Sequence, residues 1–215
     1  VTLIGGDTTH NDSLVLSVSA QGLLAADTPA VYRSGAQVGD KIYVSGTLGD
    51  AAYALQHPDN AIGIELAHRL HMPTPRISLG ATLAKIGATS MIDISDGLYQ
   101  DLGHICQQSG VSIRLNLEQL PTSNPLANID LSERLLCQLA GGDDYELAFT
   151  LPSHIEPPIG NTTVTYIGDV IALASDRSTD NVAHKRPELY YQGQPVTPTH
   201  PAPFTTWPNL TGYQH

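Results

Sequence analysis

The stretch Ile92-Asp93-Ile94-Ser95-Asp96-Gly97 is the most informative part of the sequence, because it marks the point where a buried strand is predicted to end and a helix to begin. Apolar and polar residues alternate along it, which is the two-residue period of a strand with one buried face. Beyond it, Leu98, Leu102 and Ile105 share one face of a predicted helix that ends near Gly110. Ligands bind at strand ends in α/β sheets, so this turn is the first candidate site.

The two aspartates of this stretch need different explanations. Asp96 falls at the start of the predicted helix, where an N-cap residue is common. Capping does not explain Asp93, a carboxylate set between two isoleucines near the end of a strand. Such a group normally has a cation or a hydrogen-bond network to satisfy it. We therefore expect functional roles for Asp93 and Asp96, and we expect Ser95 to point to the same side of the strand as Asp93.

Helix-like and strand-like stretches alternate along the chain, which favours an α/β class over an all-β sandwich. Strands are predicted at residues 1–4, 13–23, 41–45, 90–94, 111–115, 146–150 and 163–170, and helices at about 50–55, 60–70, 77–86, 98–108 and 131–139. The residues after about 170 are rich in Pro and Thr and are predicted to form an extended, irregular tail.

Composition narrows the possible partners. The chain has 215 residues, 41% of them hydrophobic, which is ample for a buried core. A net charge of -11 repels nucleic acid, and no apolar run approaches the ~20 residues of a membrane span. The two cysteines, Cys106 and Cys137, are predicted to be buried free thiols of a cytoplasmic protein. We expect neither a nucleic-acid nor a membrane partner.

Two glycine-acid motifs and one arginine are further candidates. In Gly5-Gly6-Asp7-Thr8-Thr9, exposed amides after two glycines can hold phosphate oxygens and Asp7 offers a ligand for Mg²⁺; a hairpin turn is the alternative. Gly141-Gly142-Asp143-Asp144-Tyr145-Glu146 gathers three acidic residues before an apolar strand, with a solvated loop as the alternative. Arg33 is a candidate phosphate clamp in a chain poor in basic residues.

Several familiar chemistries lack their sequence motifs. There is no Walker-type glycine-lysine loop, no Rossmann glycine fingerprint, no His-Glu-x-x-His and no Gly-x-Ser-x-Gly. His68 and His71 lie three residues apart on a predicted helix with no matching ligand nearby, so we interpret them as surface histidines.

Taken in order, these motifs resemble the thiamine-monophosphate kinase family, within the superfamily of aminoimidazole ribonucleotide synthetase. The resemblance rests on GGDTT (5–9), RSGAQVGD (33–40), YVSGTLGDAA (43–52), PTPR (73–76), DISDGLYQDLGHI (93–105), GGDDYEL (141–147) and GYQH (212–215). The alternatives are another ATP-dependent enzyme of that superfamily, such as selenophosphate synthetase or the hydrogenase maturation factor, and an inactive fragment that only binds ligand.

The resemblance implies Mg²⁺- and ATP-dependent phosphorylation of thiamine monophosphate to thiamine diphosphate by in-line transfer, with several Mg²⁺ ions and a homodimer. It implies magnesium ligands at Asp7, Asp93 and Asp96, ATP contacts at Gly6, Asp7, Arg33 and Ser95, and catalytic roles for Asp93, Asp96 and Arg33. It implies a substrate site at Asp143, Asp144, Glu146 and Tyr213, with Asp143 the acidic residue expected to face the substrate.

The resemblance also divides the chain. Members of the family carry a longer N-terminal part, so residues 1–29 are expected to be the remnant of an N-terminal ATP-binding and dimerisation domain. Residues 30–215 are expected to form the C-terminal α/β domain, a mixed sheet with flanking helices. An apolar strand at residues 1–4 would have no partner in this chain. We therefore expect residues 1–29 to be displaced, disordered or paired with another chain, and the 215 residues alone to transfer no phosphate.

Overall fold

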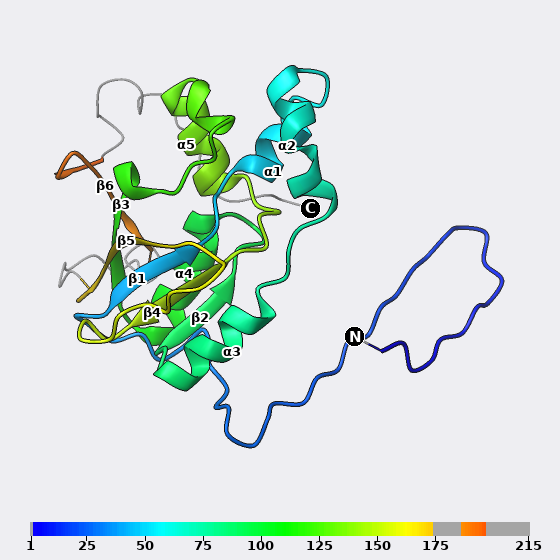
Figure 1. Ribbon diagram of the computed structural model, residues 1–215, viewed down its shortest axis with the longest axis horizontal. Coiled ribbons are helices and arrows are strands. Elements are labelled where there is room, and N and C mark those ends of the chain that lie inside the picture. Colours follow the sequence, from blue (N-terminus) through cyan, green and yellow to red (C-terminus); the bar gives the residue numbers. More distant parts are fainter. Residues whose placement is uncertain (1, 174–185, 197–215) are drawn as a thin grey trace, which may run out of the picture.

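The computed structural model describes residues 2–173 and 186–196, and a seven-stranded sheet forms its centre (Figure 1). The strands are β1 (Lys41–Ser45), β2 (Ser90–Asp93), β3 (Ser112–Asn116), β4 (Leu147–Leu151), β5 (Val164–Ile171), β6 (Glu188–Tyr191) and β7 (Gln194–Pro195). Their order is β2-β4-β1-β5-β3-β6-β7, and β3 with β6 is the one parallel pair among the described strands. The helices are α1 (Asp50–Gln56), α2 (Ala61–His71), α3 (Ile77–Ile86), α4 (Leu98–Ser109) and α5 (Leu131–Ala140). The α/β class and the mixed sheet are thus confirmed.

Side-chain alternation gives the sheet two apolar faces. Along β1, Ile42 and Val44 point into the main core, which also contains Leu102 of α4. Tyr43 points the other way and stacks on Phe149 of β4, with ring centroids 5.6 Å apart. Leu83 of α3 belongs to the same apolar cluster as Tyr43 and Phe149. The sheet is therefore covered by α4 on one face and by α3 on the other.

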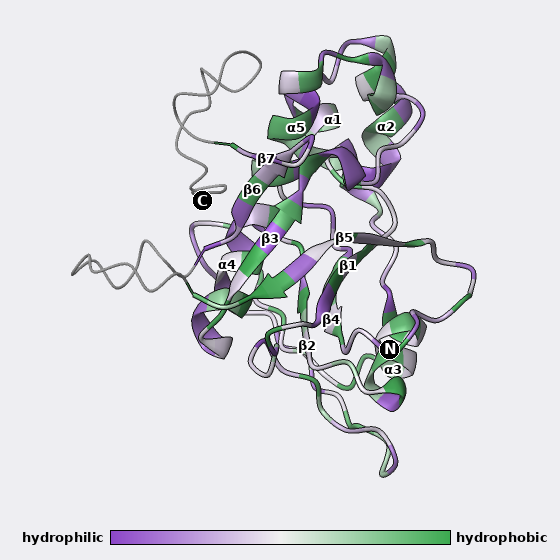
Figure 2. Cartoon of the chain, turned by 90° about the vertical axis from the view of Figure 1, so that its left-hand side faces the viewer, coloured by the Kyte–Doolittle hydropathy of each residue, from purple (hydrophilic) through white to green (hydrophobic). Residues whose placement is uncertain are grey.

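The remaining helices gather at one end of the sheet. In both views α1, α2 and α5 lie together, well away from α3 (Figures 1 and 2). A small core of Tyr53, Leu66 and Cys137 joins these three helices. Cys106 and Cys137 are buried free thiols, as predicted, and burial raises the pKa of each to about 12. No helix in the described ranges is long and apolar enough to cross a membrane.

Two predictions about the ends of the chain were wrong. Residues 2–29 contain no strand, so the strands expected at 1–4 and 13–23 are not formed. Apolar alternation makes a strand only where a neighbouring edge accepts its hydrogen bonds, and the side chains of Leu3, Leu16 and Val18 are at least 83% exposed. Conversely, β6 and β7 lie where an irregular tail was expected, because β6 pairs with β3.

Candidate functional site

The end of β2 and the turn that follows it carry the polar residues Asp93, Ser95 and Asp96. Ile92 and Ile94 are buried in the main core, as the alternation predicted, while Asp93 is exposed at the end of the strand. Capping does not account for Asp96, because the N-cap of α4 is Gly97. The Asp96 carboxylate instead accepts a hydrogen bond from Gln100 Nε2 at 3.1 Å.

A residue that the sequence analysis missed holds this turn. Asp101 is 2% exposed, and its Oδ2 accepts the backbone N–H groups of Ser95 at 3.0 Å and Asp96 at 3.1 Å. Burial raises its pKa to about 6. The sequence did contain a signal for Asp101. It follows Leu98 by three residues and so lies on the apolar face of the predicted helix. A carboxylate on that face needs a partner.

The second glycine-acid motif is paired with the first turn. Asp143 N–H donates to Ser95 O at 2.9 Å and Tyr145 N–H to Ile94 O at 2.8 Å. Gly142 has a φ of +66°, and a Cβ there would lie 2.4 Å from Ser95 O, so this position requires glycine. The backbone of Asp143 (φ 58°) and Tyr145 (φ 49°) is also left-handed, which is costly for a tyrosine. Strain of this kind is concentrated at functional sites.

Asp93 lies between two hollows, which we name after one residue of each. The Arg33 hollow has a volume of about 510 Å³ and is bordered by Arg33, Ser34 and Asp93. Arg33 is brought there because its segment runs along β2, where Met91 N–H donates to Tyr32 O at 2.9 Å. The Tyr145 hollow, of about 460 Å³, is almost entirely apolar and is lined by Pro73, Pro75, Arg76, Ile77, Gly80, Met91, Asp93, Tyr145 and Leu147.

The three acidic residues of the second motif have different surroundings. Asp143 is half-buried, and its carboxylate accepts a hydrogen bond from Tyr145 OH at 3.3 Å. Asp144 is 2% exposed, and both of its oxygens accept the Gly49 N–H at 3.0 Å. Glu146 is fully buried. Substrate contact by Asp144 and Glu146 stays a prediction, but their oxygens already have partners within the chain.

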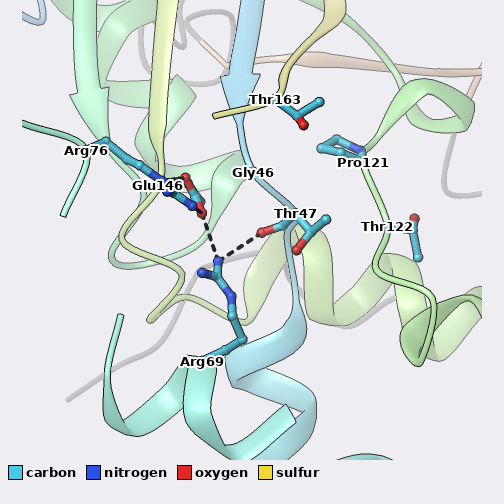
Figure 3. A pocket seen from close by; sticks show the side chains of 8 residues that line it. All are labelled: Gly46, Thr47, Arg69, Arg76, Pro121, Thr122, Glu146 and Thr163. Carbon is cyan, nitrogen blue, oxygen red and sulfur yellow. Dashed lines mark hydrogen bonds and ion pairs between the residues drawn. The ribbon is translucent and has the colours of Figure 1, made fainter. Parts of the chain in front are cut away.

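Glu146 joins the segments of Arg69, Arg76 and Ser45, and Figure 3 shows it with the two arginines. It forms a bidentate ion pair with Arg76, with Nε–Oε2 and Nη2–Oε1 distances of 2.7 and 2.6 Å. Arg69 Nη2 donates to Oε1 at 2.9 Å, and Ser45 Oγ donates to Oε2 at 2.5 Å. Burial opposes ionisation of Glu146, yet these donors hold its pKa below the ordinary value. A third hollow, of about 340 Å³, lies beside this cluster, and Arg76 lines both it and the Tyr145 hollow.

The structure does not bring every predicted residue to this site. Gly6 and Asp7 are exposed on the segment of residues 2–29, which extends away from the sheet (Figure 1). The one side-chain hydrogen bond described for Asp7 is local, with Thr8 N–H at 2.8 Å. Tyr213 lies outside the described residues. Roles for these three residues stay predictions.

The turn has the chemistry of a divalent-cation site. Carboxylate oxygens are the ligands that Mg²⁺ prefers, and Asp93 and Asp96 supply them at one end of β2. Within the described residues no group donates a hydrogen bond to the Asp93 carboxylate, although two buried isoleucines flank it. Oxygen atoms of Asp96 and Asp101 and a ring nitrogen of His104 lie within 4.8 Å of one another, close enough to face a common cation.

We predict that Asp144→Asn stabilises the protein more at pH 7 than at pH 4. Burial raises the Asp144 pKa well above its ordinary 3.8. As the pH rises through this window, the unfolded chain loses the proton while the folded chain keeps it, so the wild type loses stability. Asparagine removes that loss and still accepts the Gly49 N–H. Melting temperatures of both proteins from pH 4 to 7 test this, and a constant difference would contradict it.

Comparison with known proteins shows which family the chain belongs to. Residues 37–153 match the family described as AIR synthase related protein, C-terminal domain. The chain is 37% identical over 212 residues to the thiamine-monophosphate kinase of Haemophilus influenzae, covering 93% of this chain and 61% of that relative. The domain with its acidic turn therefore belongs to the AIR synthase-related family, and its resemblance to the thiamine-monophosphate kinases is confirmed.

Solved structures give the same result. A crystal structure of thiamine-monophosphate kinase from Stenotrophomonas maltophilia superposes with a TM-score of 0.64 at 32% identity, covering 77% of this chain and 54% of that one. A structure of AaThiL complexed with AMPPCP and TMP gives a TM-score of 0.61 at 32% identity, covering 78% of this chain and 52% of that one. The chain thus spans between about half and three-fifths of the length of these proteins.

Proposed function

We propose that the protein containing this chain phosphorylates thiamine monophosphate to thiamine diphosphate, using ATP and Mg²⁺. One observation carries the proposal: Asp93 borders both the Arg33 hollow and the Tyr145 hollow. A kinase must hold a donor and an acceptor on either side of the group that is transferred. The complex of AaThiL with AMPPCP and TMP, at 32% identity, supports the choice of both substrates.

The two hollows suit different substrates. Arg33 is exposed at the rim of its hollow, where a guanidinium can bind phosphate oxygens of ATP in bidentate fashion, and Ser95 would contribute a further ATP contact. The Tyr145 hollow offers an apolar lining next to Asp93, and its Tyr145 donates a hydrogen bond to Asp143. Such a lining with carboxylates nearby suits a flat, positively charged ring such as a thiazolium. Arg76 adds little repulsion there, because Glu146 neutralises it.

The chemistry requires charge neutralisation more than proton transfer. The nucleophile is a phosphate oxygen of thiamine monophosphate, which is ionised at neutral pH, so no general base is needed. Asp93 and Asp96 would hold Mg²⁺, with Asp7 as a further ligand, and the metal would supply positive charge to the phosphates. Arg33 would hold the terminal phosphates of ATP in line with the acceptor.

We further propose that residues 1–29 belong to an N-terminal domain and residues 30–215 to a C-terminal one. Leu3, Ile4 and Leu14 are at least 88% exposed in residues 2–29, an exposure typical of side chains that pack against another polypeptide segment. Pairing of this segment within a cytoplasmic homodimer would bring Gly6 and Asp7 to the nucleotide. Strong amide protection of residues 2–23 in a monomer of the 215-residue chain would contradict the division.

The division of the site into a nucleotide side and an acceptor side predicts opposite effects of substitutions on the two sides. Arg33→Ala should raise the KM for ATP about tenfold or more and change the KM for thiamine monophosphate little, because a charged hydrogen-bond donor is lost on the nucleotide side. Asp143→Ala should do the reverse, as should Tyr213→Ala. Steady-state kinetics with each substrate varied in turn measures both constants, and equal effects on both substrates would contradict the division.

A further inference from the structure

The turn that carries Asp93 and Asp96 depends on a residue to which the proposed function gives no role. Asp101 is 2% exposed in the first turn of α4, and no lysine or arginine of the described residues forms an ion pair with it. A buried carboxylate without a cation is costly unless its oxygens accept hydrogen bonds. Its hydrogen bonds therefore indicate what it does.

Those hydrogen bonds go to the backbone of the candidate metal-binding turn. Oδ2 of Asp101 accepts the N–H groups of Ser95 at 3.0 Å and Asp96 at 3.1 Å, both of which precede the helix. Gly97, the N-cap, has no side chain that could take this part. Gln100, also in the first turn, holds the Asp96 carboxylate through Nε2. The first turn of α4 thus fixes both the backbone and the side chain of Asp96.

The other side of the turn is fixed as well. Ser95 O accepts the Asp143 N–H at 2.9 Å, and a Cβ at Gly97 would lie 2.9 Å from the Cα of Ala140. Without Asp101, the two N–H groups of Ser95 and Asp96 would lose their described acceptor. The backbone of the turn would then be held only from the side of Asp143, and Asp96 only through the hydrogen bond from Gln100 to its carboxylate.

We propose that Asp101 is a positioning residue for phosphoryl transfer, which accepts the Ser95 and Asp96 N–H groups and so holds the turn in the geometry in which Asp93 and Asp96 bind metal. The inference rests on the proposed function for the metal, whereas the hydrogen bonds can be tested by themselves. Substitution of a residue that orients a metal ligand without itself binding the metal typically lowers metal affinity about tenfold to 100-fold.

Two substitutions at one position separate hydrogen bonding from charge. Asp101→Asn keeps an acceptor oxygen, which turns toward Ser95 and Asp96 because an amide NH₂ would face two donors there. Asp101→Ala removes the acceptor. The measurements are amide hydrogen exchange at Ser95 and Asp96 by NMR, and Mn²⁺ affinity by electron paramagnetic resonance in the presence of a non-hydrolysable ATP analogue. Both use a polypeptide of the relatives' full length that contains this chain.

We expect Asp101→Ala to speed exchange of both amides and to weaken Mn²⁺ binding, each about tenfold or more. Asp101→Asn should stay within about threefold of the wild type in both measurements, because the hydrogen bonds remain. If Asp101→Ala does not fold, Asp101→Ser, whose side chain is too short to reach both amides, takes its place with the same expectation.

Asp40, which directly precedes β1, is the matched control for Asp101, because it is also a buried aspartate that accepts two hydrogen bonds. It is 5% exposed, and its Oδ2 accepts Gln37 N–H at 2.9 Å and Thr89 Oγ1 at 2.7 Å. Asp40→Ala should lower the melting temperature and leave Mn²⁺ affinity unchanged. Unchanged Mn²⁺ affinity in Asp101→Ala, or equal losses in Asp101→Ala and Asp101→Asn, would overturn the inference. A wild type that binds no Mn²⁺ would reject the proposed metal site and this role with it, while exchange would still report the hydrogen bonds.

Discussion

Asp93→Ala is expected to lower kcat/KM for ATP-dependent phosphorylation by about 100-fold or more, without lowering the melting temperature. The loss follows from removing a proposed ligand of the metal that neutralises the phosphates. Stability should be unaffected, because Asp93 is exposed and none of the described residues donates to its carboxylate. Asp96→Ala should have an effect of the same order on activity. Initial rates at saturating ATP, with thiamine monophosphate well below its KM and over a range of Mg²⁺ concentrations, measure kcat/KM for both variants.

Asp59 is the matched control for this prediction. It is an exposed aspartate in the turn before α2 and lines none of the three hollows. Asp59→Ala should keep wild-type rates at every Mg²⁺ concentration. If Asp93→Ala and Asp96→Ala also kept near-native turnover at limiting Mg²⁺, the assignment of the metal site would be wrong.

Glu146→Ala is expected to destabilise the protein by about 3–5 kcal/mol, the usual cost of removing one partner from a buried ion pair. The substitution leaves the guanidinium groups of Arg69 and Arg76 without their main counter-ion, although their side chains are only 13% and 16% exposed. Glu146→Gln should cost less, since its oxygen can still accept from one donor. Chemical denaturation at neutral pH gives the free energy of unfolding for each variant.

Glu133 forms the comparison pair for this experiment. It contacts His57 Nε2 at 2.8 Å, but the two side chains are 39% and 35% exposed. Glu133→Ala should therefore cost about 1 kcal/mol or less. A Glu146→Ala variant as stable as Glu133→Ala would show that the Glu146 cluster does not hold the three segments together.

Much of the fold could be predicted because its signals are local. The helix from Ile77 to Ile86 was predicted with its bounds, and Gly87 ends it in the left-handed conformation expected of a terminating glycine. The alternation around Asp93 gave the buried and exposed sides of β2 correctly. The predictions for residues 2–29 and for β6 were wrong because strand formation is not a local property. A strand depends on a partner that the local pattern does not specify.

The site was predicted less completely, because its charges meet through the fold. Sequence motifs proposed Asp93, Arg33 and the loop before β4 as candidates, and the structure places the first two at the border of one hollow. That Arg69 and Arg76 would converge on Glu146 could not be read from the sequence, because the two arginines and Glu146 lie on separate segments. Long-range contacts of this kind decide which carboxylate is available to a ligand and which one is structural.

Formation of thiamine diphosphate from labelled ATP is the decisive measurement of the proposed kinase activity. A polypeptide of the relatives' full length that contains these 215 residues is incubated with thiamine monophosphate, Mg²⁺ and ATP labelled in its γ-phosphate, and the products are separated by chromatography. We expect label in thiamine diphosphate, dependent on Mg²⁺ and reduced about 100-fold or more by Asp93→Ala. Label that stays in ATP or inorganic phosphate under all conditions, with the protein folded, would contradict it.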